Sequence, residues 1–255
     1  MTSDTTEMTL ARTLLPQEVA GVLARVAQSR PRVQCLTNTV AQNITANMLL
    51  AFGAIPSMAI HVDEVAAMAE GAGAILINIG TINAESELAI PKLLEVARDH
   101  GKPVVFDPVF VELSPLRRHI AGQVLRLPDI LVRGNATEMA ALSFDLAAAE
   151  GVTRVTTGKI DRIESGTASF AVAHGHPLMT RVTGIGCAAG ALIAACCAVE
   201  ANRAVAAAAA LTAYGIAGEI AAERCRGPGS FEVELIDAVA AMDAATLAAR
   251  MGTAR

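Results

Sequence analysis

The sequence predicts a three-layer α/β/α domain in which helices cover both faces of a mostly parallel central sheet. Short apolar runs alternate with helical stretches along the 255 residues, and several runs lack polar alternation. Alternating strands and helices favour a parallel sheet, whose doubly covered strands show such continuous apolar runs. No Pro/Gly/Ser-rich linker divides the chain, and its length suits one large domain. We therefore expect a single domain over 1–255, with residues 1–15 as a flexible N-terminal tail.

Six β-rich runs are expected to form the sheet, and a seventh to lie at its edge. The edge candidate, Thr167–Ala173, follows a change of pattern after the sixth run. The six runs are Val33–Leu36, Ser57–Ile60, Ala74–Ile79, Pro103–Phe106, Ile130–Val132 and Thr153–Thr156.

Capping residues, glycine and proline mark the helices between these strands. Gly53 and Gly101 stop the first and third of them, and Pro91 predicts a kink in the third. Asp63 is expected to cap the second, and Ser114 followed by Pro115 begins the fourth. The first three helices are expected over Val40–Phe52, Glu64–Glu70 and Glu85–His100.

The C-terminal part is dominated by apolar, Ala-rich helices. They are expected over Gly186–Val199, over Arg203–Arg224 and from about Phe231. The apolar run Cys187–Val199 is shorter than the about 20 residues of a membrane span. We therefore expect buried helices, and a homo-oligomer that buries further apolar surface.

Composition excludes several classes of function. The net charge is −5 and no Lys/Arg cluster occurs, which argues against nucleic acid and anionic membranes as partners. The five cysteines form no C-x-x-C pair, which argues against a disulfide framework or a zinc site. With a polar N-terminal segment of no signal-peptide type, the chain is expected in the reducing cytoplasm.

Polar or glycine-rich residues follow five of the predicted strands. Ligands of open α/β sheets bind outside the carboxyl ends of the strands, so these residues are candidates for a site. They are Thr37-Asn38, Asn78 with Gly80-Thr81, Asp107-Pro108, Arg133-Gly134-Asn135 and Thr157-Gly158.

A glycine-framed helix start, Thr183-Gly184-Ile185-Gly186-Cys187, is the most informative segment. Glycines allow close approach of the backbone, and free N–H groups together with the helix dipole favour an anion. The alternative is a plain Gly-rich turn. A dinucleotide-binding variant through Gly190 is disfavoured, because no βαβ unit with an acidic strand end follows.

Cys187 lies in the first turn of this helix, where the helix N-terminus is expected to lower its thiol pKa. The alternative is a small buried cysteine. Cys196 and Cys197 lie in the apolar body of the same helix and are expected in the core.

Two carboxylates are candidate magnesium ligands. Glu138 follows Asn135 by three residues near a helix start, where the pair could hold hydrated Mg²⁺ or form an N-terminal capping box. Asp107 directly follows a strand, where it could bind metal or merely begin a turn. Together with Arg133 and the anion-binding helix start, these residues are what phosphoryl transfer requires. A serine hydrolase has no support because G-x-S-x-G is absent, and all five histidines are expected at the surface.

The pairing of Asn135-x-x-Glu138 with Gly184-x-Gly186 resembles the ribokinase-like fold. Kinases of that fold usually carry Asp after the second glycine, and Cys187 in its place is typical of the hydroxyethylthiazole kinase family. Further stretches resemble that family from about Val33 to Phe231. They are Cys35-Leu-Thr-Asn38, Asn43-Ile-Thr-Ala-Asn47, Gly53–Ala59, Leu76–Thr81, Asp107-Pro108-Val109, Arg133-Gly134-Asn135, His176–Gly184 and Gly227–Phe231.

The resemblance implies ATP-dependent phosphorylation of 5-(2-hydroxyethyl)-4-methylthiazole with Mg²⁺, by a homotrimer with its sites at subunit interfaces. It also implies roles for individual residues. Cys187 would lie beside the reacting hydroxyl, which it would orient or deprotonate. Met58, Gly184 and Asn38 would contact the thiazole, Arg133 and Thr157 would contact ATP, and Asp107 and Glu138 would serve Mg²⁺.

Three departures from the family pattern keep alternatives open. Phe110 stands where the family usually has glycine, Ile185 replaces a small or hydroxyl residue, and the stretch from Asn135 to Thr157 is shorter than usual. A non-catalytic metabolite-binding protein on the same fold is therefore one alternative. A kinase of another small primary alcohol is a second, although Cys187 in place of Asp argues against it.

Overall fold

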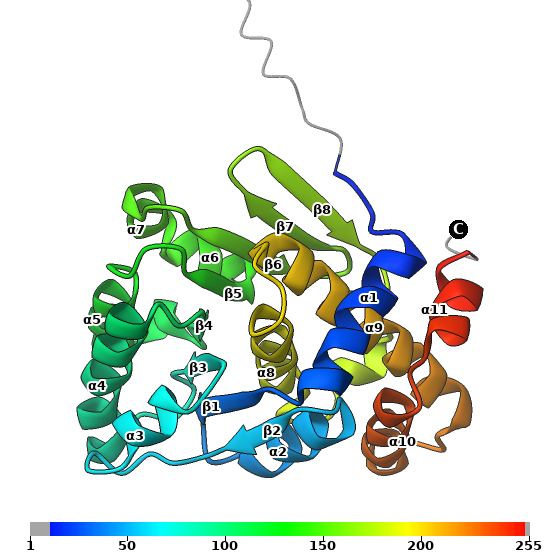
Figure 1. Ribbon diagram of the computed structural model, residues 1–255, viewed down its shortest axis with the longest axis horizontal. Coiled ribbons are helices and arrows are strands. Elements are labelled where there is room, and N and C mark those ends of the chain that lie inside the picture. The colour runs from blue at the N-terminus through cyan, green and yellow to red at the C-terminus, as the bar shows by residue number, and fades with distance from the viewer. Residues whose placement is uncertain (1–10, 253–255) are drawn as a thin grey trace, which may run out of the picture.

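The computed structural model describes residues 11–252, which form a sheet covered by helices on both faces (Figure 1). The strand order is β2-β1-β3-β4-β5-β6-β7-β8, parallel from β2 to β6 and antiparallel from β6 to β8. The strands are β1 Arg32–Leu36, β2 Ile55–Ser57, β3 Ala74–Asn78, β4 Val104–Asp107, β5 Leu131–Asn135, β6 Thr153–Thr157, β7 Asp161–Ser165 and β8 Ala168–Val172. The predicted three-layer arrangement is therefore confirmed.

The helices divide into two groups, one on each face of the sheet. In Figure 1, α3 to α7 lie on one side, and α1, α2 and α8 to α11 lie on the other. Two short 3₁₀ helices, η1 Val111–Leu113 and η2 Pro177–Thr180, join strands to helices. The α-helices are α1 Pro16–Ser29, α2 Gln42–Ala51, α3 Val65–Glu70, α4 Ala84–His100, α5 Pro115–Val124, α6 Ala136–Ala141, α7 Ser143–Ala148, α8 Ile185–Cys197, α9 Arg203–Arg224, α10 Pro228–Ala240 and α11 Ala244–Met251.

The sheet separates two apolar cores, which explains its continuous apolar strands. Successive side chains of a strand point to opposite faces. In β3, Leu76 therefore packs with α8 and α9, whereas Ile75 and Ile77 pack with the helices of the other face. Because each buried strand supplies apolar side chains to both cores, polar and apolar residues do not alternate along it.

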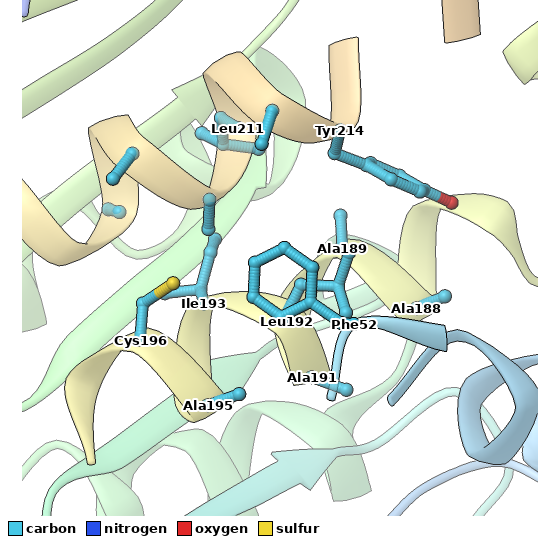
Figure 2. Close-up of a cluster of buried hydrophobic side chains, with 14 of the residues drawn as sticks. Phe52, Ala188, Ala189, Ala191, Leu192, Ile193, Ala195, Cys196, Leu211 and Tyr214 are labelled. Atoms are coloured by element: carbon cyan, nitrogen blue, oxygen red, sulfur yellow. The ribbon is translucent and has the colours of Figure 1, made fainter. Parts of the chain in front are cut away.

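The core around α8 is built mainly from small side chains. Every residue from Ala188 to Cys197 is buried. Figure 2 shows alanines of α8 beside Leu211 and Tyr214 of α9, with Phe52 against the same group. Small side chains allow α8 and α9 to approach each other and the sheet closely, which seats the start of α8 at the carboxyl ends of the strands.

Helix α9 is long and apolar enough to span a membrane by length and composition, with a mean hydropathy of 1.5. Within the structure, 89% of that window is buried. The helix is therefore a core helix of the domain, as the sequence predicts for this Ala-rich stretch.

Several element boundaries differ from the predicted ones. Strand β2 ends at Ser57, so the predicted Ser57–Ile60 lies almost wholly after it. The N-cap of α3 is Glu64 rather than Asp63, and no side chain caps it. Helix α4 runs without interruption through Pro91. Strand β7 and helices α1, α7 and α11 are additional to the predicted elements, whereas α6 begins where the helix start after Asn135 was expected.

The flexible N-terminal tail, predicted over residues 1–15, extends too far along the chain. Arg12 forms an isolated parallel bridge with Phe170 of β8, and its N–H donates to the Ser169 carbonyl at 2.8 Å. Leu14 is buried in the core between α1 and the sheet. Main-chain pairing and burial thus fix residues 11–15, while residues 1–10 lie outside the described residues.

Candidate active site

The carboxyl ends of β1, β3, β4 and β5 converge next to the start of α8, which packs across β1, β3 and β4. The parallel register pairs Asn78 at the end of β3 with Asp107 at the end of β4. This convergence brings together polar residues that are up to 149 positions apart in sequence.

Asparagine side chains connect three of these elements by hydrogen bonds. The Asn38 Nδ2 donates to the Asn78 Oδ1 at 3.0 Å and to the Cys187 Sγ at 3.2 Å. The Asn78 Nδ2 donates to the Asp107 Oδ2 at 2.8 Å. Both asparagines are buried, and each uses its amide to satisfy a buried partner. These bonds fix the side chains that follow β1, β3 and β4 relative to one another.

Asp107 also accepts a hydrogen bond from Arg133 of β5, whose Nη1 lies 3.3 Å from Oδ2. Asp107 is only 1% exposed, and burial raises its pKa to about 6. The Arg133 charge opposes that rise in pKa, whereas the negative charge of Glu138 adds to it. A further cation near Asp107 would favour its ionised form.

The thiol of Cys187 does not have the lowered pKa that its position in the helix predicts. Burial raises the pKa of this thiol, and the negative charge of Asp107 raises it further. The hydrogen bonds from Asn38 and Asn78 and the charge of Arg133 oppose the shift without reversing it. The expectation of a partly ionised Cys187 is therefore wrong, because burial and the nearby Asp107 carboxylate disfavour the thiolate.

The start of α8 is open for an anion. Ala188 is the first residue of the helix whose N–H bonds within it, to the Gly184 carbonyl at 2.9 Å. Among the described residues, no hydrogen-bond partner is recorded for the N–H groups of Ile185, Gly186 and Cys187. Three main-chain donors and the positive end of the helix dipole thus meet at the predicted anion hole.

Gly184 has a conformational and a steric reason to be glycine. Its φ is +81°, a region that favours glycine, and a Cβ here would come within 2.7 Å of the Ile44 Cγ2. At Gly186 a Cβ would point to Arg133, with its nearest nitrogen 3.6 Å away. The Arg133 guanidinium therefore lies beside the start of α8, and its buried Nε has no partner among the described residues.

Ile185, between the two glycines, is fixed by the core and by helix α9. Ile185, which departs from the expected family pattern, points into the core and is buried. Its carbonyl accepts a hydrogen bond from the buried Tyr214 hydroxyl of α9 at 3.0 Å. Its larger side chain therefore occupies core space, while α9 fixes the first turn of α8.

A capping box forms at α6, as the structural interpretation of Asn135 and Glu138 predicts. The Asn135 Oδ1 accepts from the N–H groups of Thr137 and Glu138, and the Glu138 Oε2 accepts from the Asn135 N–H at 2.8 Å. The Glu138 Oε1 accepts from the Phe110 N–H at 3.0 Å. Glu138 is buried, so its negative charge stays near Asp107.

Phe110 adopts a left-handed conformation with φ of +54°, which accounts for glycine being usual at this position. Its side chain is 53% exposed, and the Arg117 guanidinium lies 5.9 Å from the centre of its ring. Phe110 is absent from the residues that line the cavity described next. The Phe110 ring therefore does not narrow that cavity.

A cavity of about 450 Å³ opens beside the start of α8, and Arg133 lines it. Thr157 also lines it and donates from Oγ1 to the Gly134 carbonyl at 3.3 Å. The cavity continues between the turn after β6, the loop 174–180 and helix α9. Its volume lies in the usual range of small-molecule sites.

The substrate-side candidates lie outside this cavity. Met58 follows β2, is half-buried, and packs against the core that contains α2 and α8. Asn38 and Cys187 are joined by their hydrogen bond but do not line the cavity. The start of α8 therefore separates the cavity from the side where Asn38, Met58 and Cys187 lie.

One residue expected at the surface, His174, forms part of the cavity wall. The Nδ1 of His174 lies 3.1 Å from the Glu219 Oε1, and the His174 side chain is only 12% exposed. The sequence offers no spacing that would pair them, because they are 45 residues apart. Their proximity depends on how α9 packs against the loop 174–180.

Within residues 11–252, no group of three or more His, Cys, Asp or Glu side chains is arranged to hold a metal ion. A cation at this site would therefore depend on Asp107 and Glu138 together with water or a bound ligand.

Comparisons with known proteins agree on one family. The model of the hydroxyethylthiazole kinase family matches residues 23–153 and 143–245, and the two segments overlap within the stretch that the sequence predicts to be shortened. A hydroxyethylthiazole kinase of Granulibacter bethesdensis is 40% identical over 95% of this chain and 96% of its own.

Solved structures share the fold. The structure of a hydroxyethylthiazole kinase protein from Pyrococcus horikoshii OT3 superposes with a TM-score of 0.84, at 36% identity over 89% of this chain and 94% of that one. A ribokinase-like superfamily protein from Enterococcus faecalis has a TM-score of 0.66 at 15% identity, over 90% of this chain and 95% of its own. The second likeness shows the ribokinase-like fold alone.

Proposed function

Because this chain belongs to the hydroxyethylthiazole kinase family, we propose that it transfers the γ-phosphoryl group of ATP to the hydroxyl of 5-(2-hydroxyethyl)-4-methylthiazole. One observation carries the proposal beyond the family match. A chain of side-chain hydrogen bonds connects Cys187, Asn38, Asn78, Asp107 and Arg133. It lies at the start of α8, beside a cavity of nucleotide size.

The γ-phosphoryl group would lie at the start of α8, with the rest of ATP in the cavity. There the N–H groups of Ile185, Gly186 and Cys187 and the Arg133 guanidinium would stabilise the charge on the transferring oxygens. Phosphoryl transfer depends mainly on positioning and charge stabilisation, which this arrangement supplies. Thr157, in the same wall, would contact ATP.

The thiazole would lie on the other side of the helix start, near Asn38, Met58 and Gly184. Its hydroxyl oxygen would attack the γ-phosphorus, the bond from phosphorus to the ADP oxygen would break, and the hydroxyl proton would pass to an oxygen of the transferred phosphoryl group and then to solvent. Cys187, whose sulfur accepts from Asn38, would orient the hydroxyl as a neutral thiol. A loose transition state needs little activation of the attacking oxygen, so a protonated thiol is compatible with this role.

Asp107 and Glu138 fit a magnesium site in their chemistry. Both are buried carboxylates. Burial raises the pKa of Asp107, and the negative charge of Glu138 adds to this rise against the opposing charge of Arg133, so a further cation would favour the ionised pair. Both Glu138 oxygens already accept main-chain hydrogen bonds, so Glu138 would reach the ion through water. Bound Mg²⁺ neutralises charge on the phosphates of ATP.

We also infer a homotrimer that works in the cytoplasm as a single kinase domain. Val40, two residues after Asn38, is 62% exposed, which supports a neighbouring subunit near the substrate side. The five cysteines are all free, in keeping with a reducing compartment. Neither nucleic acid nor a membrane is part of this proposal.

The test is substrate-dependent release of ADP from ATP, Mg²⁺ and the hydroxyethylthiazole. We expect release by the wild-type protein and its loss in Arg133→Ala, because this variant removes the guanidinium beside the helix start. Circular dichroism would check that the variant is folded.

The two alternatives give different results in the same assay. A folded protein that binds the thiazole in calorimetry but releases no ADP would be a metabolite-binding protein. ADP release with another small alcohol, such as a hydroxymethylpyrimidine, but not with the thiazole would reassign the substrate. The position of Phe110 outside the cavity favours the kinase.

A further inference from the structure

The wall of the cavity contains a histidine that the phosphoryl-transfer chemistry does not use. His174 lines the cavity together with Gly175 and Tyr214. Its Nδ1 is 3.1 Å from the Glu219 Oε1, and the same oxygen accepts from the Gly175 N–H at 3.0 Å. One carboxylate oxygen therefore holds both the ring and the main chain of this loop.

Two glycines of α9, Gly215 and Gly218, allow the loop 174–180 to pack closely against the helix. A Cβ at Gly215 would lie 2.5 Å from the His174 carbonyl oxygen, and one at Gly218 would lie 2.5 Å from the Met179 Sδ. At Gly215 the close atoms belong to the His174 backbone, so only glycine permits this approach, and the loop is positioned on α9 at His174. The imidazole is thereby held in place in the cavity wall.

The carboxylate also determines which ring nitrogen of His174 carries hydrogen. Glu219 as a carboxylate can only accept, so Nδ1 must donate to it. In the neutral ring Nε2 is then a hydrogen-bond acceptor. Among the described residues, none is recorded as a partner of Nε2.

Two kinds of surface line the cavity. Arg133, Thr157 and Gly186 belong to its wall and would hold the phosphates. Apolar residues such as Leu211 and Ala189 also line it, together with His174 and its oriented acceptor. An apolar wall with one oriented acceptor suits a flat heterocycle that carries an amino group.

We propose that His174 is a nucleobase-specificity residue that accepts a hydrogen bond at Nε2 from the 6-amino group of adenine, with Glu219 as its positioning residue. The inference rests on the proposed function, since it requires a nucleotide in this cavity. Hypoxanthine has an oxygen at position 6, so two acceptors would face each other and remain unpaired. An unpaired buried acceptor lowers affinity, and we expect ATP to bind about 10- to 100-fold more tightly than ITP.

The experiment measures Kd for Mg–ATP and for Mg–ITP by calorimetry, independently of turnover. His174→Phe keeps a planar ring without nitrogen and should bring the ATP/ITP ratio to within about twofold of one. His174→Gln places an amide oxygen in reach and should keep part of the preference. Melting temperatures would check that each variant is folded.

His176→Ala is the matched control. This histidine lines the same cavity two residues later, but its Nδ1 accepts from the Leu178 N–H, and within residues 11–252 it has no carboxylate partner. The ATP/ITP ratio should stay at the wild-type value. A collapse of the ratio in His176→Ala but not in folded His174→Phe would overturn the proposal.

Glu219→Gln tests the positioning role. The ¹⁵N shifts of the His174 ring should report the Nδ1–H form in the wild type and a mixture in this variant, with a reduced ATP/ITP ratio. An unchanged ring spectrum together with an unchanged ratio would contradict the role of Glu219.

The two proposals can fail separately. Selective ATP binding without phosphorylation of the thiazole would refute the proposed function and leave the nucleobase inference standing. Phosphorylation of the thiazole with equal affinity for ATP and ITP would refute the nucleobase inference and leave the proposed function standing. A wild-type protein that binds neither nucleotide would overturn both.

Discussion

Cys187 shows how tertiary surroundings decide the chemistry of a residue. Its place at a helix start favours a thiolate, but burial and the charge of Asp107 raise the pKa of the thiol. Asn38 donates to the sulfur, which therefore acts as an acceptor in the hydrogen-bonded chain. These facts favour an orienting role over that of a general base.

A serine substitution separates the two roles of Cys187. The Ser hydroxyl can still accept from Asn38, so we expect Cys187→Ser to keep kcat within about tenfold of the wild type. Loss of a general base costs about 10²- to 10⁴-fold. The measurement is kcat for ADP release at saturating thiazole.

Cys187→Ala serves as the comparison, because it leaves the Asn38 donor without its sulfur partner. It should lower kcat more than serine does. A loss of more than about 100-fold in Cys187→Ser would instead indicate a thiolate base.

Single residues of the site could be predicted only where one sequence rule applied. Asn38, Asp107 and Arg133 were identifiable because they lie at or near the carboxyl ends of strands, and parallel strands end at one edge of a sheet. The link through Asn78, which pairs with Asp107, depends on strand register. The pairing of His174 with Glu219 depends on packing, and no local pattern indicates it.

At the scale of elements, α8 combines two functions that meet at Gly184. Its body is buried against the sheet, and its first turn offers unpaired N–H groups. Because Gly184 has φ of +81° and touches α2 closely, the chain turns sharply into the helix. The position of the anion hole therefore depends on the close packing of Gly184 against α2.

Replacing Gly184 with alanine should damage both stability and activity. The left-handed backbone and the contact with Ile44 at 2.7 Å are expected to lower the free energy of unfolding by about 1–3 kcal/mol. The shift of the helix start should also lower kcat/KM. Urea unfolding and the ADP assay measure the two effects.

Gly229→Ala is the control for this substitution. Gly229 lies in the first turn of α10, and a Cβ there would meet nothing within 4 Å. Its stability and activity should match the wild type. Equal stability of Gly184→Ala and wild type would contradict the steric argument.

Elements were predictable where burial imposed a clear pattern. Helix α9 has the predicted bounds, and the parallel strands other than β2 lie close to theirs, because both faces are buried. Strand β7 escaped prediction because only Ile163 among its five residues is buried, so its sequence looks like a polar loop. Helix α7 is six residues long, too short for a periodic pattern, and α6 of the same length was indicated only by its capping residues.

At the scale of the whole molecule, the open question is what covers the exposed apolar side chains. Val40 is 62% exposed near the substrate side, and Phe144 of α7 is 85% exposed. Oligomeric state depends on surfaces that meet between copies, so no pattern within one chain determines it. The proposed trimer follows from family resemblance and from the exposure of Val40.

Light scattering would measure the assembly directly. We expect a mass of three times 26.2 kDa for the wild type. Val40→Glu should shift it toward smaller species, because a buried unpaired charge opposes association. Phe144→Glu, at a distant exposed position, should leave it unchanged, and a wild-type monomer would contradict the trimer.

The alanine layer of α8 and α9 limits how this protein can vary over evolution. These buried positions already hold the smallest side chain with a Cβ, so nearly every replacement adds volume (Figure 2). Overpacking a close-packed core costs about 1–3 kcal/mol per substitution, which few marginally stable proteins tolerate repeatedly. We therefore expect changes in ligand preference to arise in the surrounding loops, while the buried positions of α8 and α9 accept few substitutions.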